Sequence, residues 1–388
     1  MLKNVVLKLY GKEMTIYFFK IKLLRKEKKG IIMKKVLILL VAVVLLVTLG
    51  AGCKTTAAAQ TTAAAETTAA AEKIKIGFSF PTKNNEFWMK SLDFVNYAAK
   101  ELNVEVMAQD CDNKQDKQIN DVDNMIAAGI KGLVLAPQDA SVCPGIVQKA
   151  KSKNIPVMIA DRWPGDDLKA GVDYLGFIGP NDVQAGYDIA MALINAGSKN
   201  LVGIGGFAGT SVAEGRKEGL MKAVKENESK GVKLLQYEAA GENMDQGDKA
   251  LRNMLQANDN IDGVWCYNDS HALASVNILK EKKMLDKVKV GGMDLLNPAI
   301  DSIAKGELFF STGGHYMQTG FALIMVFDAI NGKNPTESIV RLNLLNVTKD
   351  NLDKFKAKYL DNPTPVDIKN MSQTFNPNAK TFFELTLN

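Results

Sequence analysis

The chain has 388 residues, of which 46% are hydrophobic and 23% charged, a balance typical of globular proteins and a length that suits two or three domains. The formal net charge of +5 arises in the first 53 residues, which hold 11 Lys or Arg and 2 acidic residues, so that the remainder carries a net charge of −4. A mildly acidic protein without a basic stripe lacks the phosphate-neutralising surface that nucleic-acid binding requires, and we expect no nucleic-acid partner.

The N-terminal 53 residues contain the parts of an export signal. The motif MetLysLys at 33–35 precedes an uncharged apolar run at 36–49, which is shorter than the roughly 20 residues that a membrane span requires. The run ends in LeuGlyAlaGlyCys, an arrangement that resembles a bacterial lipoprotein signal, whose cysteine is lipidated and becomes the new N-terminus. The Leu stands four residues before Cys53, whereas the family usually has it at three, so an ordinary signal peptide with an incidental cysteine is the alternative.

These features divide the N-terminal region into two parts. We expect residues 1–52 to be a leader and signal peptide, with Met33 as a candidate true start, and Cys53 to anchor the protein to a membrane through its lipid. Residues 55–72 repeat ThrThrAlaAlaAla three times, each time followed by Gln or Glu. Because this repeat contains no large apolar residue, it cannot bury a core, and we expect 53–72 to be a tether.

From Lys73 onward, short apolar runs alternate with stretches of helical periodicity, the first of which has Asn84 and Asn85 as candidate caps. Its apolar face carries Trp88, Leu92, Val95, Ala99 and Leu102. We predict ten strands: Ile74–Phe80, Val104–Ala108, Gly132–Ala136, Pro156–Ala160, Tyr174–Ile178, Leu201–Gly206, Val232–Tyr237, Gly263–Tyr267, Val288–Gly292 and Leu308–Thr312. Such alternation predicts parallel sheets covered by helices, and ten strands suit two sheets better than one. We therefore expect two α/β domains with a ligand cleft between them.

Polar and aromatic residues directly follow five of these strands. They are AsnAsnGluPheTrp at 84–88, AspArg at 161–162, AlaGlyThrSer at 208–211 followed by Arg216, AsnAsp at 268–269, and Asp294. Ligands of open parallel sheets bind beyond the carboxyl ends of the strands, so we expect these groups at one edge. Carboxylates, amides and guanidinium groups pair with hydroxyls, and aromatic rings stack on apolar ring faces. The set predicts a site for a polyhydroxylated ring.

In their order along 74–345, these motifs resemble the periplasmic sugar-binding proteins of ABC transporters, of the ribose-binding type. The resemblance implies the periplasmic binding protein type I fold, in which two Rossmann-like doubly wound α/β/α domains are joined by a hinge and enclose a ligand cleft. It implies an N-terminal lobe of 73–179 plus 315–345 and a C-terminal lobe of 180–314. Residues 346–388 are then a C-terminal extension that packs on the lobes.

The same resemblance implies a role for each motif residue. Phe87 and Trp88 take the two faces of the sugar ring. Hydrogen-bonding groups come from both lobes: Asn85, Asp161 and Arg162 from the first, and Arg216, Asn268 and Asp294 from the second. Two positions depart from the ribose pattern, because Glu242 stands where that type has another aromatic residue, and Gly314 beside His315 stands where it has Gln. Glu242 and His315 are further candidate site residues, and which sugar binds stays open.

Structural roles are the alternatives for several of these residues. The alternative for Asp161 and Arg162 is a helix cap and a surface ion pair. The alternative for Asn268 is a role only as the N-cap of a helix. The alternative for Phe87 and Trp88 is that they are core residues of a helix. Against this alternative, adjacent residues of a helix are not expected to face one core.

The sequence offers little for catalysis. It has no P-loop, HExxH or CxxC motif, and GlyIleGlyGlyPheAlaGly at 203–209 misplaces the third glycine of a dinucleotide loop. The sequence has two histidines, His271 and His315. We expect His271 to have a structural role inside a helix, and the sequence has no recognisable nucleophile elbow with which either histidine could form a catalytic triad. Three cysteines follow the leader, an odd number that argues against a disulfide framework, although a bridge between Cys111 and Cys143 stays open. We expect that the protein is not an enzyme and that it has no cofactor and no metal site.

Two functions fit these observations. The first is a monomeric, extracytoplasmic receptor, anchored by lipid at the cell surface or in the periplasm, that captures a pentose or hexose and passes it to an ABC transporter permease. The second is a sensor that presents a sugar or a furanose-like signal to a receptor kinase or chemoreceptor. A transcriptional regulator of the repressor type needs a DNA-binding headpiece before the sugar domain, where this sequence has a leader and a tether.

Overall fold

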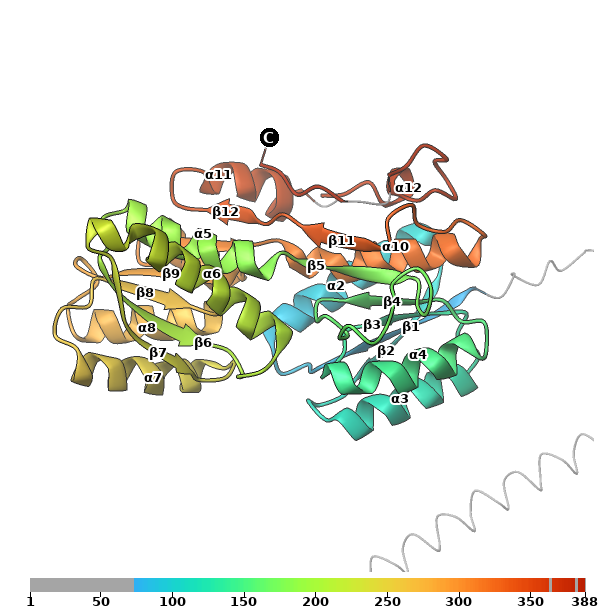
Figure 1. Ribbon diagram of the computed structural model, residues 1–388. Coiled ribbons are helices and arrows are strands. Elements are labelled where there is room, and N and C mark those ends of the chain that lie inside the picture. Colours follow the sequence, from blue (N-terminus) through green and yellow to red (C-terminus); the bar gives the residue numbers. More distant parts are fainter. Residues whose placement is uncertain (1–72, 363–364, 381–382, 388) are drawn as a thin grey trace, which may run out of the picture. The chain divides into compact units, whose positions relative to one another are not determined.

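The computed structural model describes residues 73–388 apart from 363–364, 381–382 and 388 (Figure 1). The leader predicted over 1–52, the lipidation site Cys53 and the tether lie outside the described residues. The described part contains two six-stranded sheets with helices packed against them, as the alternation of strands and helices predicts.

The first sheet has six parallel strands in the order β11-β5-β4-β3-β1-β2. They are β1 (Lys75–Phe80), β2 (Glu105–Asp110), β3 (Gly132–Leu135), β4 (Val157–Ala160), β5 (Gly176–Pro180) and β11 (Ile339–Leu342). Its helices are α2 (Glu86–Leu102), α3 (Gln115–Ala127), α4 (Cys143–Lys151) and α10 (Gln318–Ile330). The apolar runs of β3 and β4 are completely buried because helices cover both faces of the sheet. We call this unit the first lobe.

The second sheet has the order β12-β10-β9-β8-β6-β7, with β12 antiparallel to β10 and the other neighbours parallel. Its strands are β6 (Asn200–Gly205), β7 (Lys233–Ala239), β8 (Gly263–Cys266), β9 (Lys289–Asp294), β10 (Phe310–Gly313) and β12 (Leu345–Val347). Its helices are α5 (Asp182–Asn195), α6 (Ser211–Asn227), α7 (Met244–Ala257), α8 (Asp269–Glu281) and α9 (Asn297–Ala304). We call this unit the second lobe.

The chain passes between the lobes three times: after β5, after β10, and between β11 and β12. The second passage contains the short helix η3 (His315–Met317), and it begins at Gly314, whose φ of 95° favours glycine. The strands β11 and β12 were not among the ten predicted. Their side chains alternate between exposed and buried positions, so that neither forms the continuous apolar run that marks the other strands.

The C-terminal segment packs on both lobes (Figure 1). Its short helices are α11 (Leu352–Phe355), which contacts α9 of the second lobe, η4 (Lys356–Leu360), and α12 (Ile368–Met371), which contacts α2 of the first. Near its end, Phe383 stacks on Phe321 of α10 with ring centroids 4.0 Å apart. Buried Asp328 of α10 also holds this segment, because its carboxylate accepts hydrogen bonds from the backbone and side-chain groups of residues 372–374.

The described residues also bear on cysteines, membrane spans and metals. Cys111, Cys143 and Cys266 are all buried and free, so the possible bridge between Cys111 and Cys143 is not formed. Among the helices of residues 73–388 that are described, none is long and apolar enough to cross a bilayer. In the same part of the chain no group of three or more His, Cys, Asp or Glu side chains is arranged to hold a metal ion.

Candidate binding site

Twelve residues from both lobes line a small cavity with about 30 Å³ of free volume, far less than the roughly 300–1,000 Å³ of open small-molecule sites. All ten residues that the sequence indicates are among them, together with Val212 and Tyr267. The lining residues are Asn85, Phe87, Trp88, Asp161, Arg162, Val212, Arg216, Glu242, Tyr267, Asn268, Asp294 and His315.

The two sheets position these residues at the carboxyl ends of their strands. From the first lobe, the start of α2 follows β1, and AspArg follows β4. From the second lobe, α6 follows β6, the Glu242 loop follows β7, and Tyr267 and Asn268 follow β8, while Asp294 ends β9. Parallel strands end at the same edge of their sheet, which is why residues far apart in the sequence meet here.

Asn85 is the N-cap of α2, where its side-chain oxygen accepts a hydrogen bond from the backbone N–H of Phe87 at 2.9 Å. Asn84, the other candidate cap, lies outside the helix and is exposed. The capping bond fixes the orientation of the Asn85 side chain, and Asn85 also lines the cavity.

Phe87 and Trp88 are both buried, with 6% and 2% of their surface exposed, and both belong to the main hydrophobic cluster. The expectation that adjacent helical residues cannot face one core is wrong here, because Trp88 packs toward Phe80 while Phe87 packs on His315. The two rings meet edge to face, with centroids 5.1 Å apart and planes at 80°. They therefore form one aromatic wall, and the sequence-based placement of the rings on opposite faces of a sugar is not the arrangement in this structure.

Asp161 ends β4 in a tight turn. Its φ of 72° lies in the left-handed region, and the N–H of Arg162 donates to the carbonyl of Ala160 at 2.9 Å. The side-chain amide of Gln318 donates to Asp161 Oδ1 at 2.6 Å. Burial raises the pKa of Asp161, which Arg162 and Arg216 oppose. Neither a helix cap nor a surface ion pair describes AspArg, because no helix starts here and both side chains are buried.

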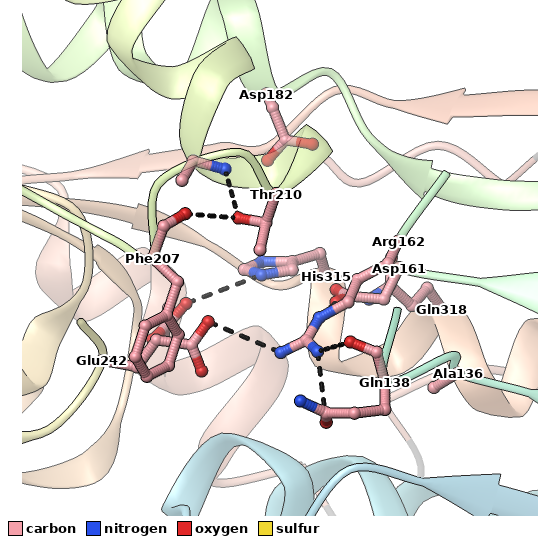
Figure 2. Close-up of polar contacts among 12 residues, drawn as sticks. Ala136, Gln138, Asp161, Arg162, Asp182, Phe207, Thr210, Glu242, His315 and Gln318 are labelled. Carbon is pink, nitrogen blue, oxygen red and sulfur yellow. Dashed lines mark hydrogen bonds and ion pairs between the residues drawn. The ribbon is translucent and has the colours of Figure 1, made fainter. Parts of the chain in front are cut away.

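Arg162 contacts groups of both lobes (Figure 2). Its Nη1 donates to the backbone carbonyl of Gln138 at 2.8 Å, and its Nη2 lies 3.4 Å from Glu242 Oε1 in the second lobe. Its Nε is 4.0 Å from the carboxylate of Asp161. The guanidinium thus forms an ion pair across the cavity with a side chain that the sequence also indicates.

Arg216 is buried on α6 and is held by three groups. Its Nε donates to Asp182 at 3.0 Å, its Nη1 donates to the carbonyl of Tyr267 at 2.9 Å, and its guanidinium lies 4.5 Å from the centroid of the Tyr267 ring. Gly186 of α5 lets the two helices approach closely, since a Cβ there would lie 1.9 Å from the Arg216 carbonyl oxygen. Burial raises the pKa of Asp182 to about 7, although Arg216 opposes the shift.

Glu242 lies in the loop between β7 and α7, whose backbone is held in place by hydrogen bonds. Gly241 has a φ of 109°, and a Cβ at this position would lie 2.4 Å from Gln246 Oε1. That oxygen accepts from the backbone N–H groups of both Glu242 and Asn243, while Asn243 caps α7. On the other side, the amide of Asn268 donates to the Glu242 carbonyl at 2.8 Å. Both ends of the loop are therefore fixed, and the carboxylate lies at the cavity wall.

Asn268 has the capping role that the sequence leaves open, and it lines the cavity as well. Its Oδ1 accepts from the N–H of His271 at 2.9 Å at the start of α8. Neighbouring Tyr267 donates its hydroxyl to Glu242 at 3.2 Å. His271 does not line the cavity: it is completely buried inside α8, and burial lowers its pKa to about 4. This placement is the structural one that the sequence predicts.

Asp294, at the end of β9, and His315, after β10, are neighbours in the cavity lining. Asp294 has a φ of 121° and Leu295 a φ of 56°, so two successive non-glycine residues adopt left-handed backbone conformations beside the site. Asp294 Oδ1 lies 3.6 Å from His315 Nε2. Burial raises the pKa of Asp294 well above its usual value and lowers that of His315 well below it, so His315 is neutral.

Sequence reasoning missed Tyr267, which lines the cavity, and Gln138, Asp182 and Gln318, which contact its lining residues. Tyr267 ends a predicted strand, and Gln138 and Asp182 each follow a strand, so their positions alone could have indicated them. Gln318 is the first residue of α10, and no local pattern distinguishes it from a core-facing residue of that helix. Its role arises from the packing of α10 against β4, which depends on the second passage between the lobes.

Comparisons with known proteins agree with this architecture. A family model described as a periplasmic binding protein domain matches residues 76–334. A putative rhizopine-binding protein of Rhizobium meliloti is 25% identical over 291 residues, which cover 73% of this chain and 93% of the relative. The D-xylose-binding periplasmic protein of Escherichia coli is 28% identical over 238 residues, covering 60% of this chain and 71% of the relative.

A solved structure gives the same result for the fold. The ABC transporter periplasmic solute binding protein of Actinobacillus succinogenes, solved with bound D-allose, superposes with a TM-score of 0.68 at 24% identity. The superposition covers 72% of this chain and 99% of that chain. The family match spans every cavity residue from Asn85 to His315. The chain belongs to the periplasmic binding protein family, and its two-lobed α/β fold is that of the type I solute-binding proteins.

Proposed function

We propose that the protein is an extracytoplasmic receptor that captures a monosaccharide in the cavity between its lobes and delivers it to an ABC transporter permease. The observation that carries this proposal is the convergence of ten sequence-indicated residues on one cavity. Carboxylates and guanidinium groups face an aromatic wall there, which suits a ring with polar hydroxyls and apolar faces. Relatives whose names include xylose- and ribose-binding proteins support the choice of ligand class.

Binding couples to closure in this proposal. The cavity has walls from both lobes, and Arg162 already bridges them through Glu242. A second bridge is formed by Lys90 of α2, whose Nζ donates to the Leu295 carbonyl in the second lobe at 2.9 Å. A sugar that contacts both walls adds differential contacts to the closed arrangement and stabilises it over an open one.

A thermal-shift screen of pentoses, hexoses and deoxy sugars tests sugar capture. A ligand at 100 times its Kd adds about 2.7 kcal/mol to the free energy of unfolding, so its sugar should raise the Tm measurably. Arg252→Lys serves as the control, because Arg252 pairs with Asp248 and Glu281 and none of these three residues lines the cavity. Sugar capture is rejected when no member of the panel raises the Tm of either protein.

Delivery is tested separately, by uptake. A strain that lacks this gene should lose high-affinity uptake of the same sugar that raises the Tm. Unchanged uptake with a clear Tm shift would remove the delivery step and leave the capture step in place.

We further propose that Cys53 carries the lipid anchor. Cys53→Ala should abolish incorporation of labelled fatty acid, whereas Cys266→Ala, which removes a buried free thiol, should leave it unchanged. A single acyl chain gives only marginal attachment, so the stable anchor requires two or more chains. Equal labelling of Cys53→Ala and the unchanged protein would contradict the lipoprotein proposal.

A further inference from the structure

We propose that Lys90 is a positioning residue for ligand capture: together with Asp269 of the second lobe it clamps one peptide group of the turn that carries Asp294, and this clamp forms only when the lobes meet. The inference rests on the proposed function, because it explains how closure of the lobes reaches a residue of the cavity. Neither Lys90 nor Asp269 lines the cavity, so both act through the turn.

The turn after β9 needs support because its backbone is strained. Asp294 has a φ of 121° and Leu295 a φ of 56°, and non-glycine residues keep such conformations only where their surroundings hold them. Gly313 of β10 lets the turn lie close, since a Cβ there would be 2.6 Å from the carbonyl carbon of Asp294. The placement of Asp294 at the cavity therefore depends on the groups that hold this turn.

Asp269, the first residue of α8, holds the turn from within the second lobe, where it is completely buried. Its Oδ2 accepts from the backbone N–H of Leu296 at 3.0 Å, and its Oδ1 accepts from the hydroxyl of Ser311 at 2.8 Å. The hydroxyl oxygen of Ser311 accepts in turn from the N–H of Leu295 at 3.4 Å. Two successive N–H groups of the turn are thus fixed by one buried carboxylate and its serine partner.

Lys90 reaches the same turn from the first lobe. Its Nζ donates to the carbonyl of Leu295 at 2.9 Å and lies 3.4 Å from Asn297 Oδ1. The carbonyl of Leu295 and the N–H of Leu296 belong to one peptide group, which therefore accepts from an ammonium group and donates to the carboxylate of Asp269. Hydrogen bonds to charged groups are the stronger ones, and linked hydrogen bonds polarise one another. The peptide group thus connects two opposite charges across the boundary between the lobes.

The ammonium group of Lys90 also lies beside the second passage between the lobes, 4.5 Å from the centroid of the Tyr316 ring in η3. Burial lowers the pKa of Lys90 to about 8, a shift that Asp269, Glu86 and Asp294 oppose. The amine is therefore protonated at neutral pH, as the clamp requires.

Separation of the lobes would leave Asp269 without this cation. Burial raises the pKa of Asp269, which the hydrogen bonds from Leu296 and Ser311 and the charge of Lys90 oppose. Both hydrogen-bond donors belong to the second lobe, so the carboxylate stays with that lobe when Lys90 leaves with the first. Because a buried charge that loses its partner is costly, the clamp opposes opening.

Lys90→Met tests the clamp, since methionine has a side chain of similar length without the ammonium group. We expect it to speed dissociation of the monosaccharide that raises the Tm most in the panel above by about ten-fold, as expected for the loss of a charge-assisted hydrogen bond. Stopped-flow tryptophan fluorescence measures the rate, because Trp88 lines the cavity. Lys90→Arg, which keeps a charged donor, should retain most of the slow dissociation. Lys100→Met, at an exposed lysine in the last turn of the same helix, should leave the rate unchanged.

A double-mutant cycle with Asp269→Asn tests whether the two residues act through the shared peptide group. Asparagine is neutral, so Lys90→Met should change the dissociation rate by less than about three-fold in this background. Ser311→Ala provides a second cycle, which also serves if Asp269→Asn does not fold. It removes a donor to Asp269 and should therefore enlarge the effect of Lys90→Met. Additive effects in either cycle would overturn the coupling.

Small-angle X-ray scattering without sugar separates failure of the clamp from failure of the proposed function. We expect Lys90→Met to have a larger radius of gyration than Lys90→Arg, because its lobes separate more easily. If this difference is present and no monosaccharide of the panel binds, sugar capture fails and the clamp stands. If a monosaccharide binds and Lys90→Met matches Lys90→Arg in both scattering and dissociation, the clamp fails and sugar capture stands.

Discussion

Arg162 illustrates how much the planar shape of one side chain contributes. Its guanidinium contacts the Gln138 carbonyl in its own lobe and the Glu242 carboxylate across the cavity, with Asp161 beside it. Three partners in three directions need donors in a fixed plane, which an ammonium group on a flexible stem does not provide. The positive charge alone therefore does not account for this residue.

Arg162→Lys should weaken binding of the protein's best ligand at least about ten-fold while the protein still folds. The reason is that the lysine keeps the charge but loses the contact that joins the two walls. Titration calorimetry and thermal unfolding of the same preparation measure the two effects. Arg252→Lys, which alters an exposed pair worth about 0–1 kcal/mol, should change neither. Normal binding by Arg162→Lys would remove AspArg from the site.

Trp88 is part of the core as well as of the cavity wall, and its mutation should show both. Trp88→Ala should lower the free energy of unfolding by about 3–5 kcal/mol, because a buried aromatic side chain leaves a cavity when removed. Denaturant unfolding measures this. Trp163→Ala, at a half-buried tryptophan, is the comparison and should cost less. A loss below about 1 kcal/mol for Trp88→Ala would show that its ring does not support the core.

At the scale of elements, the loop between β7 and α7 matters more to the site than its length suggests. The backbone N–H groups of Glu242 and Asn243 donate to Gln246 of α7, and the Glu242 carbonyl accepts from the side-chain amide of Asn268 at the start of α8. The position of one carboxylate thus depends on two helix N-termini. A change in the backbone of this loop should move Glu242 without touching its side chain.

Gly241→Ala should reduce both stability and ligand affinity more than Gly231→Ala does. Both glycines have positive φ, so both variants carry backbone strain of about 1–3 kcal/mol. A Cβ at Gly241 also collides with Gln246, whereas one at Gly231 meets open space. The difference between the two variants isolates the collision. Equal behaviour of the two in unfolding and binding experiments would mean that the loop adjusts freely.

The elements also show what a sequence can and cannot predict. Apolar runs identified ten of the twelve strands of the described residues, and the residues after them included eight of the ten sequence-indicated side chains of the cavity, whereas Glu242 and His315 came from the resemblance. The strands β11 and β12 lacked such runs, and the inward role of Gln318 depends on where the chain returns to the first lobe. The edge-to-face contact of Phe87 and Trp88 likewise follows from packing against His315 and Phe80, which are distant in sequence.

At the scale of the whole molecule, the C-terminal segment connects the lobes in addition to the three chain passages. It contacts α9 in the second lobe and α2 and α10 in the first. Asp328 is its main polar attachment, since this buried carboxylate accepts from Ser372, Gln373 and Thr374. A segment attached to both lobes limits how far they separate.

Asp328→Ala should release this attachment and leave the donors of residues 372–374 without a partner, which costs about 1–3 kcal/mol for a buried group. We expect faster cleavage within the C-terminal segment in limited proteolysis followed by mass spectrometry. Asp350→Ala, at an exposed aspartate of the same segment, provides the control. The same cleavage pattern in all three proteins would show that apolar packing alone holds the segment.

The described end of this segment also covers the joint between the lobes. Phe383 covers Phe321, and Leu385 lies against the second passage, since a Cβ at Gly314 would be 3.1 Å from its Cδ1. A rotation of one lobe against the other at this joint therefore either carries these two side chains along or exposes apolar surface to water, and the cost of that exposure opposes the rotation.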